Sequence, residues 1–72
     1  MIPEIGKSFK FRNPDTKTVL TLKKSKLKRH TYLSSQYTFL LEDQNGELWL
    51  RDNCSPKQFW REFQQIKENN NA

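Results

Sequence analysis

The chain has 72 residues, of which 33% are hydrophobic and 29% charged, and its formal net charge is +5. This length predicts a single small domain over residues 1–72, because most domains need on the order of 100 residues and few have less than about 50. No apolar run approaches the roughly 18 residues that a membrane span needs. The one cysteine and the lack of a basic, apolar leader predict an intracellular, cytoplasmic protein.

The positive charge is concentrated in the first half of the chain. Residues 1–32 hold nine Lys or Arg against two acidic residues, a balance of +7, whereas residues 33–72 balance to −2. The densest run is Lys23-Lys24-Ser25-Lys26-Leu27-Lys28-Arg29-His30. Clustered cations favour a polyanionic partner, because they gain most when phosphates replace their counterions. The alternative is a solvated loop whose charge keeps the protein soluble.

The first half of the chain predicts two strands. Residues 7–12 alternate between apolar and charged, which places Phe9 and Phe11 on one face of a half-buried strand. A turn is predicted at residues 13–15, which read Asn-Pro-Asp. Residues 17–24 are rich in β-branched side chains and predict a second strand with Leu20 and Leu22 on one face. Residues 25–36 fit either a short strand or a returning loop.

Residues 37–43 and 48–52 predict a β-hairpin. Asn45-Gly46 suits a two-residue type I′ turn, in which both central residues need a positive φ. This turn places Leu41 opposite Leu50, with Leu40 opposite Arg51 and Glu42 opposite Trp49. The face assigned to the core then carries Phe39, Leu41, Leu48 and Leu50. The other face carries Leu40, Glu42, Trp49 and Arg51.

The end of the chain predicts a helix. Ser55 is a good N-cap, Pro56 suits the first helical position, and Gln58 completes a capping box. Cys54 and Phe59 occupy the two positions of a hydrophobic staple. An apolar stripe runs along Phe59, Phe63 and Ile66. We expect residues 68–72 to form a frayed tail.

Together these elements predict a mainly β (α+β) fold. We expect a strongly bent antiparallel sheet of four or five strands, closed or half closed like an SH3 barrel, with one C-terminal helix. The alternative is an open three-stranded sheet packed on that helix. The apolar side chains suffice for one core between sheet and helix, and a homodimer is compatible with the modest stability expected of so small a domain.

The sequence lacks the side chains that catalysis or metal binding requires. His30 and Cys54 are 24 positions apart with no third orienting group, and no set of ligands has zinc spacing. No glycine-rich phosphate loop is present, because the chain has only two glycines. We therefore expect no enzyme, no catalytic residue, no metal and no cofactor.

Cations combined with accessible aromatic rings are typical of nucleic-acid-binding surfaces. The predicted contacts to DNA or RNA are Lys23, Lys24, Lys26, Lys28, Arg29, His30, Tyr32, Trp49 and Arg51. We expect this binding to be mainly electrostatic and weakly selective for sequence. A second predicted surface on the helix has the composition of a protein-binding site. It consists of Trp60, Arg61 and Lys57, and its partner would be an acidic protein surface.

The whole-chain pattern resembles the small SH3-like β-barrel proteins of phages and prophages. The resemblance rests on Ile5-Gly6-Lys7-Ser8-Phe9, on the Glu42-Asp43-x-x-Gly46 hairpin, and on Ser55-Pro56-Lys57-Gln58-Phe59-Trp60-Arg61-Glu62-Phe63. It implies the cytoplasm of a bacterial or phage-infected cell. It also implies an alternative function, a phage- or mobile-element-encoded inhibitor or adaptor that binds a host or defence protein.

Residues 37–67 are also similar to the three-stranded-sheet-plus-helix DNA-binding domains of phage and transposon integrases. In those domains the sheet enters the major groove. This second resemblance implies that Leu40, Glu42, Trp49 and Arg51 face the groove.

Overall fold

A computed structural model describes residues 1–13 and 17–67 of the chain. Most of the turn predicted at residues 13–15, and the predicted tail at 68–72, lie outside these residues. The elements in chain order are β1 (Ser8–Phe11), β2 (Leu20–His30), β3 (Ser35–Asp43), β4 (Leu48–Cys54), α1 (Pro56–Glu62) and β5 (Phe63–Gln65). None of the helices in the described residues is long and apolar enough to cross a membrane.

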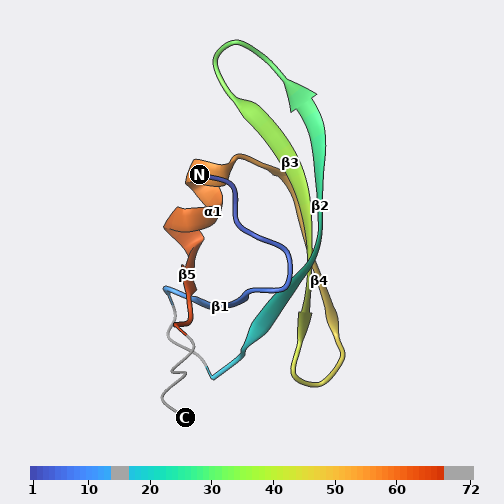
Figure 1. Ribbon diagram of the computed structural model, residues 1–72, viewed down its shortest axis with the longest axis vertical. Helices are drawn as coiled ribbons and strands as arrows, with labels where there is room; N and C mark the ends of the chain where they lie inside the picture. The colour runs from blue at the N-terminus through green and yellow to red at the C-terminus, as the bar shows by residue number, and fades with distance from the viewer. Residues whose placement is uncertain (14–16, 68–72) are drawn as a thin grey trace.

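The strands form one antiparallel sheet in the order β4-β3-β2-β1-β5. The sheet bends so that β1 and β5 lie across from β3 and β4, with α1 beside them (Figure 1). The sheet does not close into a barrel, because β4 and β5 remain its two edges. The predicted class, a bent antiparallel sheet with one short C-terminal helix, is confirmed, whereas the three-stranded alternative is wrong.

Residues 25–36, for which the sequence allows either a strand or a loop, form the outer part of a long β-hairpin. β2 continues to His30, and β3 begins at Ser35, so the two strands pair almost to the turn. The turn is held by Thr31, whose backbone N–H donates to the Ser34 carbonyl at 3.0 Å and whose hydroxyl donates to the same carbonyl at 2.8 Å. This hairpin projects beyond the rest of the molecule (Figure 1).

The register predicted between β3 and β4 is wrong by one residue. Leu41 lies opposite Trp49, and Leu40 lies opposite Leu50. The loop has three residues, because the Asp43 N–H donates to the Glu47 carbonyl at 2.9 Å. Three-residue loops place a left-handed residue last, and Gly46 has a φ of +80°.

A one-residue shift turns every side chain of β4 to the other face of the sheet. Leu48 and Leu50, which were predicted to be core residues, are therefore 60% and 63% exposed. Trp49 and Arg51 turn toward the side on which Phe39 and Leu41 are buried.

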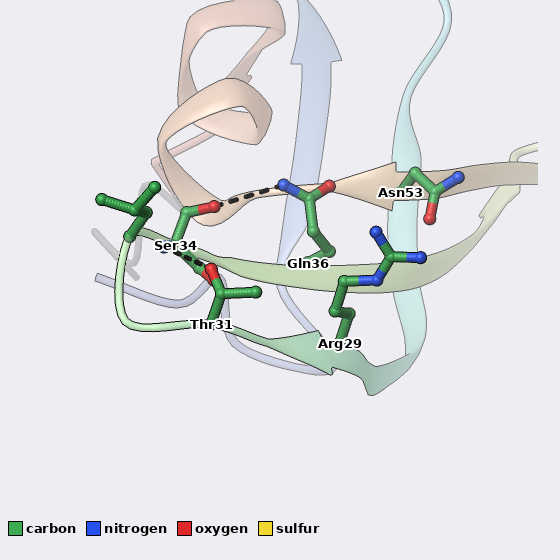
Figure 2. A pocket seen from close by; sticks show the side chains of 6 residues that line it. Arg29, Thr31, Ser34, Gln36 and Asn53 are labelled. Carbon is green, nitrogen blue, oxygen red and sulfur yellow. Dashed lines mark hydrogen bonds between the residues drawn. The ribbon is translucent and has the colours of Figure 1, made fainter.

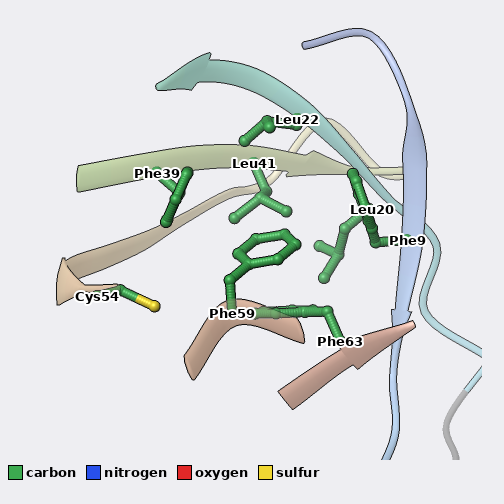
Figure 3. Close-up of a cluster of buried hydrophobic side chains, with 8 residues drawn as sticks. All are labelled: Phe9, Leu20, Leu22, Phe39, Leu41, Cys54, Phe59 and Phe63. Atoms are coloured by element: carbon green, nitrogen blue, oxygen red, sulfur yellow. The ribbon is translucent and has the colours of Figure 1, made fainter. Parts of the chain in front are cut away.

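The core lies between the concave side of the sheet and α1 (Figure 3). Its buried members are Phe9, Leu20, Leu22, Phe39, Leu41, Cys54, Phe59 and Phe63. Phe59 is central among the aromatic rings, with centroids 5.1 Å from Phe9, 4.9 Å from Phe39 and 4.6 Å from Phe63. These contacts are edge-on, tilted and stacked, respectively, and such contacts at these distances are favourable for aromatic pairs.

The predicted helix start is confirmed, but the helix is shorter than predicted. The Gln58 N–H donates to the Ser55 hydroxyl at 3.1 Å, as expected of an N-cap. The helix ends at Glu62, so its predicted continuation through Phe63 and Ile66 is wrong. Residues 63–65 instead pair with β1, whose edge offers unpaired backbone groups. Arg12 holds this junction, because its Nε donates to the carbonyls of Trp60 at 2.8 Å and Phe63 at 3.1 Å.

Candidate nucleic-acid interface

Two irregularities in the pairing of β2 with β3 decide where the cations lie. Leu22 is opposite Leu41 while Lys24 is opposite Leu40, which makes Lys23 an extra residue. A second shift occurs between Leu27 and Arg29. Side chains alternate between the faces of a regular strand, and a β-bulge interrupts that alternation. Neighbouring cations can therefore share one face.

We define the outer face as the face of β2, β3 and β4 that points away from the core. On β3 it carries Leu40, Thr38 and Gln36, because the alternate residues Phe39 and Leu41 are buried. The β2 partners of these three residues lie on the same face. Those partners are Lys24, Lys26 and Arg29.

The two remaining cations reach the outer face through ion pairs. The Lys23 Nζ lies 3.7 Å from a carboxylate oxygen of Glu42, which alternates in phase with Leu40. The Lys28 Nζ lies 2.7 Å from Asp52, whose carboxylate also accepts the Thr38 hydroxyl at 2.6 Å. The outer face thus brings together five predicted contacts, which we call the cationic face: Lys23, Lys24, Lys26, Lys28 and Arg29.

The chain's own carboxylates neutralise only part of the cationic face. Lys23 and Lys28 have partners, but both pairs are about half exposed, and exposed ion pairs contribute little. The hydrogen bond from Lys28 is the main reason that the pKa of Asp52 lies below its ordinary value. Within residues 1–13 and 17–67, Lys24, Lys26 and Arg29 make no side-chain hydrogen bond or ion pair.

His30 and Tyr32, the two other predicted nucleic-acid contacts near the hairpin tip, are placed differently. His30 pairs with Ser35, one position from the Arg29–Gln36 pair, so it faces the opposite side of the sheet. Its Nδ1 lies 2.8 Å from the Ser35 hydroxyl oxygen. Tyr32 lies in the turn and is 96% exposed. Tyr32 is therefore accessible at the hairpin tip, close in sequence to Arg29, whereas His30 does not share the cationic face.

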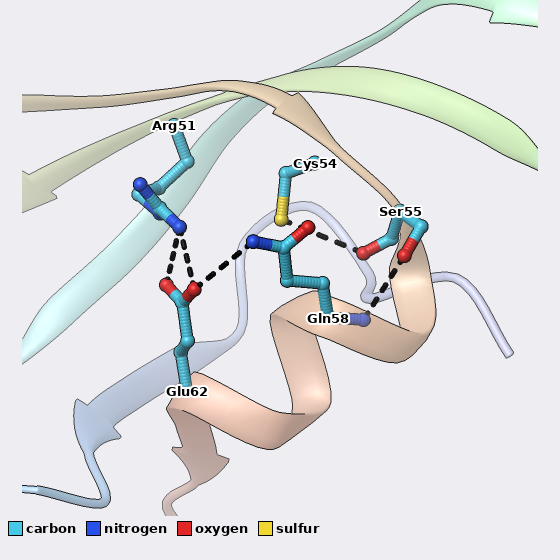
Figure 4. A network of polar contacts seen from close by, with 5 residues as sticks. All are labelled: Arg51, Cys54, Ser55, Gln58 and Glu62. Atoms are coloured by element: carbon cyan, nitrogen blue, oxygen red, sulfur yellow. Dashed lines mark hydrogen bonds and ion pairs between the residues drawn. The ribbon is translucent and has the colours of Figure 1, made fainter.

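Trp49 and Arg51 also lie away from the cationic face. Trp49 packs against Phe11 with ring centroids 5.6 Å apart, and its Nε1 donates to Asp43 at 3.2 Å. Arg51 Nη2 donates to Glu62 at 2.6 Å, bridging β4 and α1 (Figure 4). The prediction that Trp49 and Arg51 lie on the non-core face is wrong, because the three-residue loop shifts the register of β4.

The same register separates the positions that the integrase resemblance implied. Leu40 and Glu42 lie on the outer face, whereas Trp49 and Arg51 face the core side. The four side chains therefore do not form one surface that enters a groove.

The predicted protein-binding residues of the helix are only partly accessible. Trp60 Nε1 donates to the Met1 carbonyl at 2.7 Å, and its ring packs against Phe9 with centroids 5.7 Å apart. Trp60 is consequently half-buried, while Lys57 and Arg61 are exposed. Much of the indole therefore serves the packing of the N-terminus against the helix.

Sequence reasoning missed several residues of the outer face. Gln36 and Asn53 lie beside Arg29, and Leu48 and Leu50 form an exposed apolar strip on β4. The signal for the leucines was the length of the loop, because a three-residue reading of residues 44–46 turns them outward. No pattern in the sequence pointed to Gln36 or Asn53.

Cys54 is a buried core residue. Its side chain is inaccessible to solvent, and burial raises the pKa of its thiol. A neutral buried thiol is a small apolar group and a poor nucleophile. Across the part of the chain that the structure describes, no group of three or more His, Cys, Asp or Glu is placed to hold a metal ion.

Comparison with known proteins reveals no relative of this chain. No family model matches it, and neither the curated proteins nor the solved structures contain a match.

Proposed function

We propose that the chain is a non-catalytic nucleic-acid-binding module whose cationic face contacts the phosphate backbone of DNA or RNA. The observation that carries the proposal is the placement of five β2 cations on one face by the two bulges. Tyr32 packs against sugar and base from the hairpin tip. Binding is mainly electrostatic and weakly selective for sequence.

The dimensions of β2 support this proposal. A strand rises about 3.3 Å per residue, so residues 23–29 extend over roughly 20 Å. A DNA duplex carries one phosphate charge per about 1.7 Å of helix axis, so a length of about 20 Å holds about twelve, of which those on the side facing the protein can meet the five cations. Lys24, Lys26 and Arg29 have no ion-pair partner among the described residues, and they exchange only water and counterions for phosphates.

The test is a fluorescence titration of a labelled random oligonucleotide at several salt concentrations. Five phosphate contacts on duplex DNA give a slope of log affinity against log salt of about −4.5, at roughly 0.9 per contact. An affinity that does not change with salt contradicts the proposal.

Two double variants separate a specific face from net charge alone. Lys24→Glu with Lys26→Glu reverses two unpaired cations of the cationic face. Lys57→Glu with Arg61→Glu makes the same change in net charge on the exposed side of α1. The proposal expects the first variant to lose most of its affinity and the second to retain most of it. Equal losses in both contradict a localised interface.

The alternative function is an inhibitor or adaptor that binds an acidic surface of a host or defence protein. One observation favours it: Leu48 and Leu50 are exposed on the outer face beside the cations. Exposed apolar groups rimmed by charge are typical of protein-binding sites. These leucines are better candidate anchors than Trp60, whose indole N–H already has a partner.

A pull-down after nuclease treatment distinguishes the two functions. Recovery of one stoichiometric protein by the natural chain, and its loss with Leu48→Ser and Leu50→Ser, favours the adaptor. A dimer mass in light scattering of the natural chain that is lost with Leu48→Ser and Leu50→Ser would instead identify a second copy as the occupant of this strip. The nucleic-acid-binding module is favoured if the pull-down with the natural chain recovers no protein and the Lys24→Glu, Lys26→Glu variant loses oligonucleotide binding.

A further inference from the structure

A hollow with a volume of about 290 Å³ lies beside the turn between β2 and β3, next to the cationic face (Figure 2). Its lining consists of Arg29, Thr31, Leu33, Ser34, Gln36 and Asn53. Pockets for larger ligands measure about 300–1,000 Å³, so this one suits a single planar ring system. Its position makes it continuous with the phosphate-binding surface proposed above.

The polar groups around the hollow are available for a ligand. The Arg29 guanidinium and the Asn53 amide make no side-chain hydrogen bond within the described part of the chain. Gln36 uses only its amide nitrogen, in a long 3.4 Å bond to the Ser34 hydroxyl, so its carbonyl oxygen is open. Figure 2 shows these three side chains on the same side of the ribbon.

The chemistry of this lining distinguishes a base from a phosphate. A phosphate offers acceptors only, and a guanidinium alone satisfies it. An amide presents a donor and an acceptor together, which matches the mixed donor and acceptor edges of nucleobases. Two amides beside one arginine therefore fit a base edge better than an anion.

We propose that this hollow binds one unpaired nucleobase of DNA or RNA, while the cationic face holds the adjoining phosphates. The inference rests on the proposed function and deepens it, because it selects nucleic acids that carry an unstacked base. Arg29, Gln36 and Asn53 hydrogen-bond the edge of the base. Tyr32, 96% exposed on the neighbouring turn, stacks on the next base along the strand.

The experiment compares a labelled duplex containing a single unpaired base with the fully paired duplex of the same flanking sequence, each prepared as DNA and as RNA. Fluorescence anisotropy measures both affinities at one salt concentration. Stacking and edge contacts to one base predict roughly 5- to 150-fold tighter binding of the bulged duplex. The tighter of the DNA and RNA arms identifies the source of the base.

Gln36→Ala combined with Asn53→Gly tests the hollow without altering net charge or the cationic face. Both changes remove an amide that would contact the base edge, and glycine suits the left-handed backbone of Asn53, whose φ is 52°. This variant is expected to lose the preference for the bulged duplex while its affinity for paired duplex stays within about twofold, because neither residue belongs to the cationic face. Lys26→Arg, on the same face but outside the hollow, is expected to keep the preference.

The outcomes separate the two proposals. Equal affinity of the natural chain for bulged and paired duplexes overturns the base site and leaves the nucleic-acid-binding function standing. A preference that survives Gln36→Ala with Asn53→Gly also overturns the base site. Failure to bind either duplex, in DNA or RNA, overturns both.

Discussion

The inner and outer faces of β2, β3 and β4 belong to the same strands but have opposite characters. The inner face carries Phe39 and Leu41, which are inaccessible to solvent. The outer face carries cations along β2 and exposed leucines along β4. The inner face stabilises the fold by burying apolar side chains, whereas much of the outer face lacks partners in the described chain. Stability and candidate function should therefore respond to different substitutions.

The bulges explain how one strand serves both faces. With strict alternation, the cations of residues 23–29 would divide between the core side and the solvent side. The extra residues at the two register shifts keep Lys23, Lys24, Lys28 and Arg29 on one side. A charge on the core side next to buried Leu22 would be costly without a partner, so the first bulge also keeps Lys24 out of the core.

The largest expected effect comes from the centre of the inner side. Phe59→Ala removes the ring that contacts Phe9, Phe39 and Phe63, and large-to-small changes of this kind cost about 3–5 kcal/mol. Denaturant unfolding followed by circular dichroism measures the change. In a domain of modest stability this loss is expected to leave much of the chain unfolded.

The matched aromatic control is Tyr32→Ala. Because Tyr32 is 96% exposed, this substitution should change the free energy of unfolding of the protein by no more than about 0.5 kcal/mol. Comparable losses for Phe59→Ala and Tyr32→Ala contradict the division between the two regions.

A smaller effect is expected at Asn53, which lies in the irregularity of β4 between the pairs Phe39–Arg51 and Tyr37–Cys54. Its φ of 52° is left-handed, a conformation that costs a residue with a Cβ roughly 1–2 kcal/mol and that asparagine tolerates better than most. Asn53→Ala should therefore lower the free energy of unfolding by about 1 kcal/mol. Asn53→Gly is the control and should cost much less; a glycine variant as unstable as the alanine variant contradicts this account.

The β3–β4 loop makes stability depend on pH. The pKa of Asp43 lies below its ordinary value, chiefly because the carboxylate accepts the Glu47 N–H, and also the Trp49 Nε1–H and the Asn45 N–H. The unfolded chain binds the proton more readily, so this contribution is complete above the ordinary pKa of about 4 and is lost as the pH falls through the lower, folded value. We expect the denaturant midpoint to fall over that range.

Asp43→Asn isolates this contribution. The amide oxygen still accepts hydrogen bonds, but the side chain no longer titrates, so the decline of the midpoint in acid should become shallower. Glu4→Gln, at an exposed N-terminal position, should leave the shape of the pH curve unchanged. An unchanged curve for Asp43→Asn would show that the loop carboxylate does not contribute.

Local sequence patterns predicted where the strands and the helix lie better than they predicted the register between strands. Alternation at Phe9 and Leu20, and the cap at Ser55, each depend on neighbouring residues, and the structure agrees with them. The register of β4 depends on whether two or three residues form the turn, a choice that Asp43 decides through bonds to Asn45 and Glu47. The end of α1 depends on pairing with β1, which is remote in sequence. The gathering of the cations needed bulges that no local pattern marks.

The smallest expected effect is the sharpest test of that register. Leu50→Ala removes a side chain that is 63% exposed, so it should change the free energy of unfolding by about 0.5 kcal/mol or less. Leu41→Ala, on the inner face of the adjoining strand, should cost about 2–5 kcal/mol. A two-residue turn would instead bury Leu50 opposite Leu41, and the two variants would then lose similar amounts. Thermal unfolding of this pair therefore reports which face of β4 the core occupies, because both substitutions remove the same side chain.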